Sequence, residues 1–378
     1  MWKVHWRVFV AGIDMTISMR PYLTDISITD KAGSASDTCS LTFDDTDGQI
    51  HMPPEGAPIR VLMNRIQVFK GVVDKVRSTG SRGGGRLLKV TGKGFDTRGK
   101  AKEPLQFHLD DGSIGDFLSM AANFAGYTMQ VDPTFQAIKR VYQAADGESF
   151  VHLGQRLARE LGATFKIQEP IAVLVKRGVD FGLPAILGTF GGEKSNVINW
   201  DIEPFSGRRG FTKAKAQWFD REKAEFKETE VDIQIPDRTL PDAVNLIRSR
   251  AADEGQARDL VEARKGEAER EGGSGTVLLD LYPGAQAEGL FTLRGTRAGI
   301  DGQYRIESVQ HKADRKGGSV TSLSLKQPHG GAGKDSRPEG GGQPGTSVPS
   351  NAPSNGALPG TAGGDLEFIG AGEGDGPE

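Results

Sequence analysis

Short stretches in which every second residue is apolar dominate the first hundred residues. In the segment 4–10 these alternate residues are Val4, Trp6, Val8 and Val10, and a spacing of two places them on one face of a β-strand. Further strand-like stretches lie at 41–43, 59–63, 68–73 and 87–90, with a glycine-rich hairpin loop at 81–85. Short strands at close spacing favour a small barrel or sandwich, which we expect over residues 1–103.

A repeated helix–strand unit follows. Residues 111–131 pass from an Asp-Gly pair through a helix with apolar i, i+3, i+4, i+7 spacing to Gly126 and a strand. Residues 146–167 repeat this order, with Gly162 after the helix. Glycine just past a helix supplies the left-handed residue that ends it. The two units predict a small α+β module over residues 104–188.

The β pattern returns in residues 189–328, where we expect a second barrel. Its clearest strands lie at 196–200, 214–218, 304–309 and 319–325. A helix over 241–271 is inserted, opening at Pro241, a favoured first helical residue. Charges of both signs along this helix indicate either a solvated face or packing against a neighbouring subunit. The fold class expected is therefore α+β, mainly β, with two tube-like β-barrel domains.

The composition changes at residue 329. From there to residue 378 Gly, Pro, Ser and Asn dominate, and such a segment buries too little apolar surface to offset the entropy of ordering. We expect a disordered Gly/Pro-rich tail. Its one apolar cluster, Leu366–Ile369, is either a chance cluster or a peptide that docks on a partner.

The whole-chain composition excludes several classes of protein. The net charge of −3 over 378 residues gives no electrostatic reason to expect nucleic-acid binding. No stretch has the ~18 apolar residues of a membrane span, and residues 1–6 do not have the order of a signal peptide. Cys39 is the single cysteine, so an intrachain disulfide cannot form.

No motif indicates catalysis, a cofactor or a metal. Gly92–Gly99 has Thr97 where a dinucleotide-binding loop needs its third glycine, and we expect a turn. In Asp44–Gly48 the glycine comes too early for a calcium loop. The six histidines have no zinc spacing; they are His5, His51, His108, His152, His311 and His329. We therefore expect no catalytic, cofactor-binding or metal-binding residues and no enzyme activity.

A basic cluster lies in the first β region. It comprises Arg82, Arg86, Lys89 and Lys93, with few aromatic residues among them. Aromatic residues interleaved with basic ones would indicate a stacking platform for nucleic acid. A solvated hairpin is the first interpretation of this cluster. A pore lining or a salt-bridged contact is the alternative.

Four stretches, in order along the chain, carry a resemblance to a known family. Three are a strand and acidic turn at 37–61, a strand at 68–76, and a Gln-to-Phe run at 143–150. The fourth is Gly302–His311 with the glycines and strand after it. Together they resemble the phage late control protein D family of contractile-tail baseplate hubs, which is related to the N-terminal hub of type VI VgrG spikes, although the family's Asp after Ser149 is missing. The fourth stretch is similar to the family's closing "G.Y.i..v.H....G..t.l.l" and is the most specific of the four.

This resemblance implies a homotrimeric hub of two tube-like barrels per chain, which adapts a hexameric tail tube to a trimeric central spike. Its implied partners are the spike, the tube or tube-initiator protein, and the tape measure and baseplate wedge proteins, without nucleic-acid binding or a membrane anchor. The implied location is the virion tail baseplate of a phage or tailocin, assembled in the host cytoplasm. For contacts with neighbours we expect the helix 241–271 and the strand ending in His311.

Three other interpretations remain open from the sequence. A VgrG-like spike hub would need a long C-terminal β-helix, and the expected tail argues against it. A tail-associated peptidoglycan hydrolase would need an additional domain. A tail-tube subunit is usually a single barrel of about half this length.

Overall fold

The computed structural model describes residues 3–178, 185–205, 211–234, 243–334 and 337. Met1–Ser336 form one unit and Arg337–Glu378 another, and the following concerns the first. Most of the expected tail 329–378, including the apolar cluster Leu366–Ile369, lies outside the described residues. Strands far outnumber helices among the described elements, which confirms the mainly β, α+β class.

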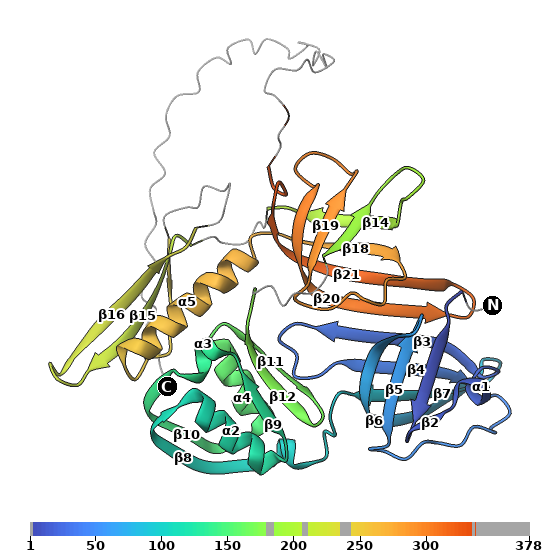
Figure 1. The fold of residues 1–378 in the computed structure, drawn as a ribbon, viewed down its shortest axis with the longest axis horizontal. Coiled ribbons are helices and arrows are strands. Elements are labelled where there is room, and N and C mark those ends of the chain that lie inside the picture. Colours follow the sequence, from blue (N-terminus) through green and yellow to red (C-terminus); the bar gives the residue numbers. More distant parts are fainter. Residues whose placement is uncertain (1–2, 179–184, 206–210, 235–242, 335–336, 338–378) are drawn as a thin grey trace, which may run out of the picture. The chain divides into compact units, whose positions relative to one another are not determined.

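The first barrel-like sheet lies at the N-terminal end of the chain (Figure 1). Its strands are hydrogen-bonded in the order β3-β4-β7-β6-β5-β1-β2. The apolar faces of these strands enclose one core, in which Leu23, Ile26 and Val61 are fully buried. The strands are β1 (Trp6–Val10), β2 (Ile13–Asp14), β3 (Leu23–Lys31), β4 (Thr38–Asp44), β5 (Pro58–Met63), β6 (Ile66–Ser81) and β7 (Gly85–Lys93).

The second barrel-like sheet uses strands from the C-terminal half. They follow the order β14-β18-β21-β20-β19-β13 around a separate core that includes Phe291 and Tyr304. Its first strand begins three residues before the expected boundary at 189. The strands are β13 (Ile186–Thr189), β14 (Val197–Glu203), β18 (Ser274–Asp280), β19 (Leu290–Arg294), β20 (Gly302–Asp314) and β21 (Gly318–His329).

The two sheets have the same strand order. Taken in chain order, β1, β3, β4, β5, β6 and β7 occupy the same places in the first sheet as β13, β14, β18, β19, β20 and β21 in the second. One orientation differs, because β1 runs antiparallel to β5 whereas β13 runs parallel to β19.

The register agrees as well. Asp44 pairs with Leu87 at the end of one ladder, and Asp280 pairs with Val320 at the end of its counterpart. Irregularities in strand pairing recur at matching places. They lie at Leu23/Asp25 and Val197/Asn199, and at Val73/Lys75 and Ile306/Ser308. Because such bulges bend and twist a strand locally, the two sheets share their curvature.

The two sheets meet through β20. Its first half pairs with β19, and its second half pairs with β3 of the first sheet, from Ser308 opposite Lys31 to Asp314 opposite Asp25. One 13-stranded sheet therefore runs through both barrels. Ala313 on β20 is fully buried in the core of the first barrel.

The first and last strands of the second barrel, β13 and β14, meet at a place that we call its seam, and the side chain of Asn196 lies there. Asn196 lies between β13 and β14, and its amide Oδ1 accepts a hydrogen bond of 2.8 Å from the Thr189 N–H. Its Nδ2 donates to the carbonyl oxygen of Leu187 over 2.9 Å. Asn196 thus satisfies two backbone groups at the edge of β13, as a neighbouring strand would.

The expected helix–strand repeat forms the α+β module. Its elements are β8 (Pro104–Ser113), α2 (Ile114–Ala125), β9 (Thr128–Val131), β10 (Lys139–Ser149), α4 (Phe150–Glu160), β11 (Ala163–Gln168) and β12 (Ile171–Lys176). β8 pairs with β10, each helix begins at a serine N-cap (Ser113, Ser149), and the two helices pack into one core. The N-caps satisfy otherwise unpaired amides of the first helical turn.

The insertion in the second barrel is larger than expected, and its helix is shorter. β15 (Lys213–Asp220) and β16 (Glu225–Asp232) form a hairpin, and α5 (Glu254–Arg270) packs on it. Pro241, the expected first helical residue, lies outside the described residues, but residues 243–253 of the expected helix are not helical. Its first part is instead β17 (Val244–Leu246), paired in parallel with β15. The helix begins only after Asp253, whose side chain accepts from the Gln256 N–H.

Replacing Asn196 tests the seam. We expect Asn196→Ala to lower the free energy of unfolding by about 1 to 2 kcal/mol, because one part-buried and one exposed hydrogen bond to the backbone of β13 are lost. Asn199→Ala, on the exposed side of β14, is the matched control and should change the melting temperature little. Equal melting temperatures for the two variants would show that the seam does not depend on this amide.

Candidate interaction surfaces

The shared strand β20 is an internal joint of the chain. It is paired on both sides, and the His311 side chain is 4% exposed. The Nδ1 of His311 lies 3.1 Å from the Thr321 hydroxyl, which itself accepts from the Tyr282 N–H over 2.8 Å. The expected contact of a neighbouring subunit with the strand ending in His311 stays a prediction, and the His311 side chain itself is buried inside the chain.

Three groups of ion pairs tie the parts of the chain together. In the first, Lys166 on β11 reaches from the α+β module to the first barrel. Its Nζ lies 2.6 Å from Asp30 Oδ1 and 2.7 Å from Asp37 Oδ1. The other oxygen of Asp30 accepts from the Ala287 N–H in the second barrel over 2.8 Å. Three parts of the chain thus meet at one lysine and two carboxylates.

Burial and the close approach of these charges change the pKa of both carboxyl groups. Burial, followed by the neighbouring Asp30 carboxylate, raises the pKa of Asp37 to about 6. Burial is the largest single influence on Asp30 and opposes its ionisation, but the charge and hydrogen bond of Lys166, together with the Ala287 N–H, outweigh burial and lower the pKa of Asp30. The ammonium therefore holds one carboxylate firmly and leaves the other able to take up a proton near neutral pH.

The second group fastens the end of α5 to the second barrel. Arg270, the last residue of the helix, is 6% exposed. Its guanidinium makes two hydrogen bonds to Glu288, of 2.9 and 3.0 Å, and also bonds Glu307 at 2.8 Å. A bidentate pair of this kind fixes direction as well as distance, so it sets the exit angle of the helix.

The third group fastens the start of α5 to the α+β module. Arg140 on β10 pairs with Asp259 on the helix and, over 3.4 Å, with Glu160 on α4. Gln256 on the helix donates to the same Glu160 over 3.1 Å. The helix therefore bridges two parts of the chain, with a polar anchor near each end.

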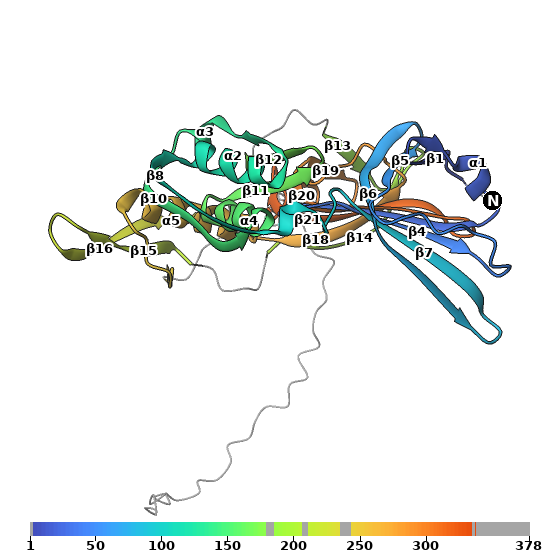
Figure 2. The ribbon, with the colours of Figure 1, turned by 90° about the horizontal axis from the view of Figure 1, so that it is seen from below.

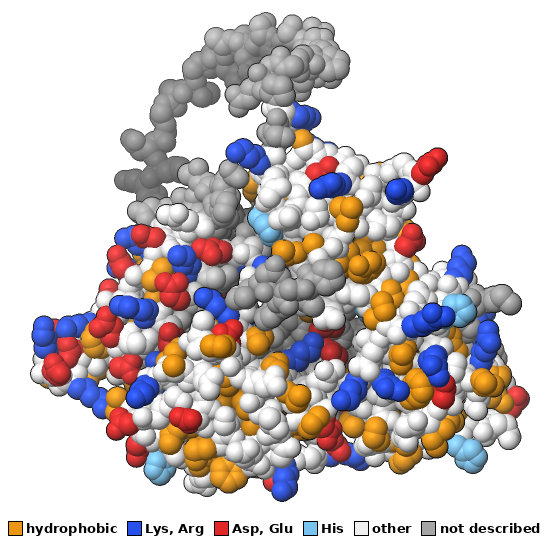
Figure 3. All heavy atoms as spheres, in the orientation of Figure 1, with side chains coloured by type: hydrophobic (Ala, Val, Ile, Leu, Met, Phe, Trp, Pro, Cys, Tyr) orange, Lys and Arg blue, Asp and Glu red, His pale blue; other side chains and the backbone are white. Residues whose placement is uncertain are grey.

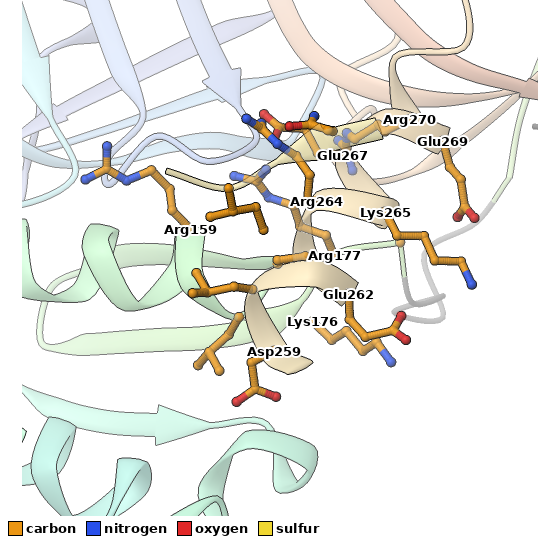
Figure 4. A pocket seen from close by; sticks show the side chains of 18 of the residues that line it. Arg159, Lys176, Arg177, Asp259, Glu262, Arg264, Lys265, Glu267, Glu269 and Arg270 are labelled. Carbon is orange, nitrogen blue, oxygen red and sulfur yellow. The ribbon is translucent and has the colours of Figure 1, made fainter. Parts of the chain in front are cut away.

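A groove of about 1270 Å³ runs along α5. Side chains of α5 line it together with Arg159 of α4 and Lys176 of β12 (Figure 4). Its labelled charges have both signs, with Arg264 and Lys265 close in sequence to Glu262 and Glu267. Within the described ranges no three His, Cys, Asp or Glu side chains come together as metal ligands would.

The basic cluster lies on a projecting hairpin. β6 and β7 extend beyond the body of the first barrel (Figure 2), and Arg77 to Arg82 are all exposed. Arg86 donates to the carbonyl oxygen of Thr46 at 2.6 and 3.1 Å, and Lys93 lies 3.5 Å from Asp74. The hairpin is confirmed, and two of its four predicted cations bond within the chain, Arg86 next to the turn and Lys93 at the far end of β7.

Large apolar side chains are exposed on both barrels. Ile17, on the short helix α1 (Thr16–Met19), is 87% exposed, and Ile13 of β2 is 65% exposed. On the second barrel Leu187 and Ile198, next to the seam, are 49% and 47% exposed. Figure 3 shows apolar side chains gathered over the second barrel. Where exposed apolar side chains form a contiguous patch, that patch is typical of a surface that contacts another protein.

The remaining sequence candidates have local roles. Gly92 and Lys93 end β7, and Gly94–Gly99 form a loop, as expected. In the acidic turn, Asp44 accepts from the N–H and hydroxyl of Thr46, and Asp45 accepts from the Ile50 N–H, so both carboxylates are used by the turn. Cys39 is buried, and burial raises the pKa of its thiol.

No protein-family model matches the chain. It is 25% identical over 170 residues to the probable baseplate hub protein of Escherichia phage 186, an alignment that covers 44% of this chain and 43% of that protein. The matched part thus spans under half of the curated relative.

Two solved structures share the fold. One is the 43 kDa tail protein of prophage MuSo2 from Shewanella oneidensis, with a TM-score of 0.65 at 16% identity over 85% of this chain and 98% of that one. The other is the tail protein from Neisseria meningitidis MC58, with a TM-score of 0.64 at 16% identity over 86% and 97% of the two chains. The resemblance to phage baseplate hubs is confirmed, and the fold is that of phage tail proteins. No helix among the described residues has the length and apolar character to cross a membrane.

Breaking the anchor of α5 tests its contribution to stability. Arg270→Met leaves Glu288 and Glu307 without their buried partner, and we expect a loss of about 3–5 kcal/mol in unfolding free energy. The control is Arg258→Met on the same helix, where an exposed pair with Glu254 contributes about 0.5 kcal/mol or less. Denaturation curves of both variants check this, and similar midpoints would contradict it.

Two buried groups should give opposite pH dependence. Burial lowers the pKa of His311 to about 4, so its contribution to stability is present above its usual pKa of 6.5 and is lost as the pH falls towards 4. Asp37, with its pKa raised to about 6, contributes stability at low pH that is lost as the pH rises through 6.

Single variants separate the two contributions. Between pH 7 and 5, Asp37→Asn should lose stability more steeply than the parent protein, because only His311 then titrates. His311→Gln should instead become more stable on acidification. Melting temperatures measured at both pH values check these signs. Parallel pH profiles for all three proteins would contradict the assignment of both groups.

Proposed function

We propose that this chain is a structural subunit of a phage-tail baseplate hub, a homotrimer that joins a hexameric tail tube to a trimeric central spike. The observation that carries the proposal is the presence of two barrels with the same strand order and register in one chain. Three such chains supply six equivalent barrels, which match a hexameric tube. Features that occur once per chain then occur three times, which matches a trimeric spike. The curated similarity to a probable baseplate hub protein supports it.

The function is mechanical. A hub that transmits the thrust of a contracting tail must keep its barrels in fixed relation. The continuous sheet at β20 and the ion pairs at Lys166, Arg140 and Arg270 would provide this rigidity. No catalytic step is assigned to the chain. The tape measure and baseplate wedge proteins remain expected partners, and the virion baseplate is its proposed location.

The mass of the purified protein tests the proposal. Light scattering should give three times the 40.5 kDa of one chain, or a 3:3 complex once the spike protein is added. A monomer that ignores the spike would overturn the trimeric hub. A peptidoglycan-hydrolysis assay on the same sample should show no turnover. Turnover would favour the alternative of a tail-associated hydrolase.

A further inference from the structure

We infer that the β6–β7 hairpin of one chain pairs with the outer edge of β14 in a second copy of the chain, and that this strand pairing closes the trimer. The inference deepens the proposed hub function and rests on it. It follows from the barrel-to-barrel contact already present within the chain, because the same contact surfaces exist a second time without an occupant among the described residues.

The contact inside the chain is made by equivalent elements. The second barrel extends its β20–β21 hairpin, and β20 pairs with the edge of β3 in the first barrel. By strand order and register, β20–β21 corresponds to β6–β7, and β3 corresponds to β14. The first barrel therefore carries the same kind of hairpin, and the second barrel carries the same kind of edge.

Both surfaces have no strand partner in the part of the chain that the structure describes. β14 pairs only with β18, and the end of β6 from Lys75 onwards pairs only with β7. A long strand edge of this kind is a template for another chain. Addition of a strand to such an edge satisfies its backbone groups.

The β6–β7 hairpin is exposed at the positions where the equivalent β20–β21 hairpin is buried. Along β20, His311 and Ala313 are buried because β3 and its barrel cover them. Their counterparts on β6, by register against β7, are Ser78 and Gly80, and both are exposed. The equivalent positions are therefore covered by a neighbouring strand on β20 and exposed to solvent on β6, which has no such neighbour among the described residues.

The internal contact also predicts the register. Lys312 lies opposite Ser27, and its counterpart on β6 is Thr79. The counterpart of Ser27 on β14 is Asp201, counted from the matching bulges of the two strands. Thr79 of one chain should therefore lie opposite Asp201 of the next.

Charge favours the pairing. The hairpin segment 75–89 contains five Lys or Arg residues and no acidic residue, whereas β14 contains Asp201 and Glu203 and no basic residue. Opposite charges across a strand pair stabilise it, and like charges destabilise it. Pro204 has no N–H to donate, so the ladder should end at Glu203.

Cysteine pairs in the full-length chain test the register. Thr79→Cys combined with Asp201→Cys should give a disulfide-closed trimer on a non-reducing gel under mild oxidation, with loss of the monomer band. Directly opposed strand residues have the short separation that a disulfide needs. The buried Cys39 should not contribute.

Controls use the same backbone. Thr79→Cys with Ile202→Cys shifts the pairing by one residue to the other face of β14, and should leave most of the protein monomeric on the gel. If the double variant misfolds, Thr79→Cys and Asp201→Cys chains are mixed. They should then give a disulfide dimer that neither gives alone.

The outcomes separate this inference from the proposed function. A trimer by light scattering without any Thr79–Asp201 disulfide would overturn the strand pairing and leave the hub intact. Equal yields from the shifted control would overturn the register. Covalent species longer than three chains would overturn ring closure. A protein that stays monomeric with and without the spike would overturn both proposals.

Discussion

The pairing of β20 with β3 is the interaction on which the rest of the structure depends. It makes two barrels into one sheet and places Ala313 of one barrel in the core of the other. A backbone ladder of this kind fixes distance and direction together along the whole paired segment. The α+β module and α5 then brace the same joint from the side through Lys166, Arg140 and Arg270.

Buried ion pairs are a costly way to gain stability, because desolvation offsets much of the attraction between the charges. Their value here lies in geometry. Lys166 lies between two carboxylates and Arg270 contacts two glutamates, so a shift of either element would leave partly buried charges at Lys166, or buried ones at Arg270, without partners. Such joints resist displacement more than an apolar contact of the same area, which tolerates sliding.

Local patterns predicted much of the fold. Alternation identified the strands of the first barrel, and the two Asp-Gly-to-helix units identified the module with its Gly126 and Gly162 ends. The helix over 241–271 was placed too early, since Val244–Leu246 pairs with β15 in a parallel ladder that no local pattern reveals. The ion pairs Lys166–Asp30 and Arg140–Asp259 join residues more than a hundred positions apart, which no local pattern can predict. Segments 71–93 and 304–326 form equivalent hairpins with matching strand pairing and bulges. Because they share few identical residues, the sequence alone did not reveal this equivalence.

The insertion of 211–270 has a consequence for symmetry. In the first barrel β3 passes to β4 through a short turn, whereas the equivalent β14 and β18 are separated by a complete subdomain. In a ring of three chains, every second barrel would therefore carry this subdomain. The two barrels of a chain have equivalent sheets, but only the second carries the inserted subdomain, so they differ outside their sheets. A sixfold lattice of strands would thus bear a threefold pattern of protrusions, set by where one piece of chain was inserted.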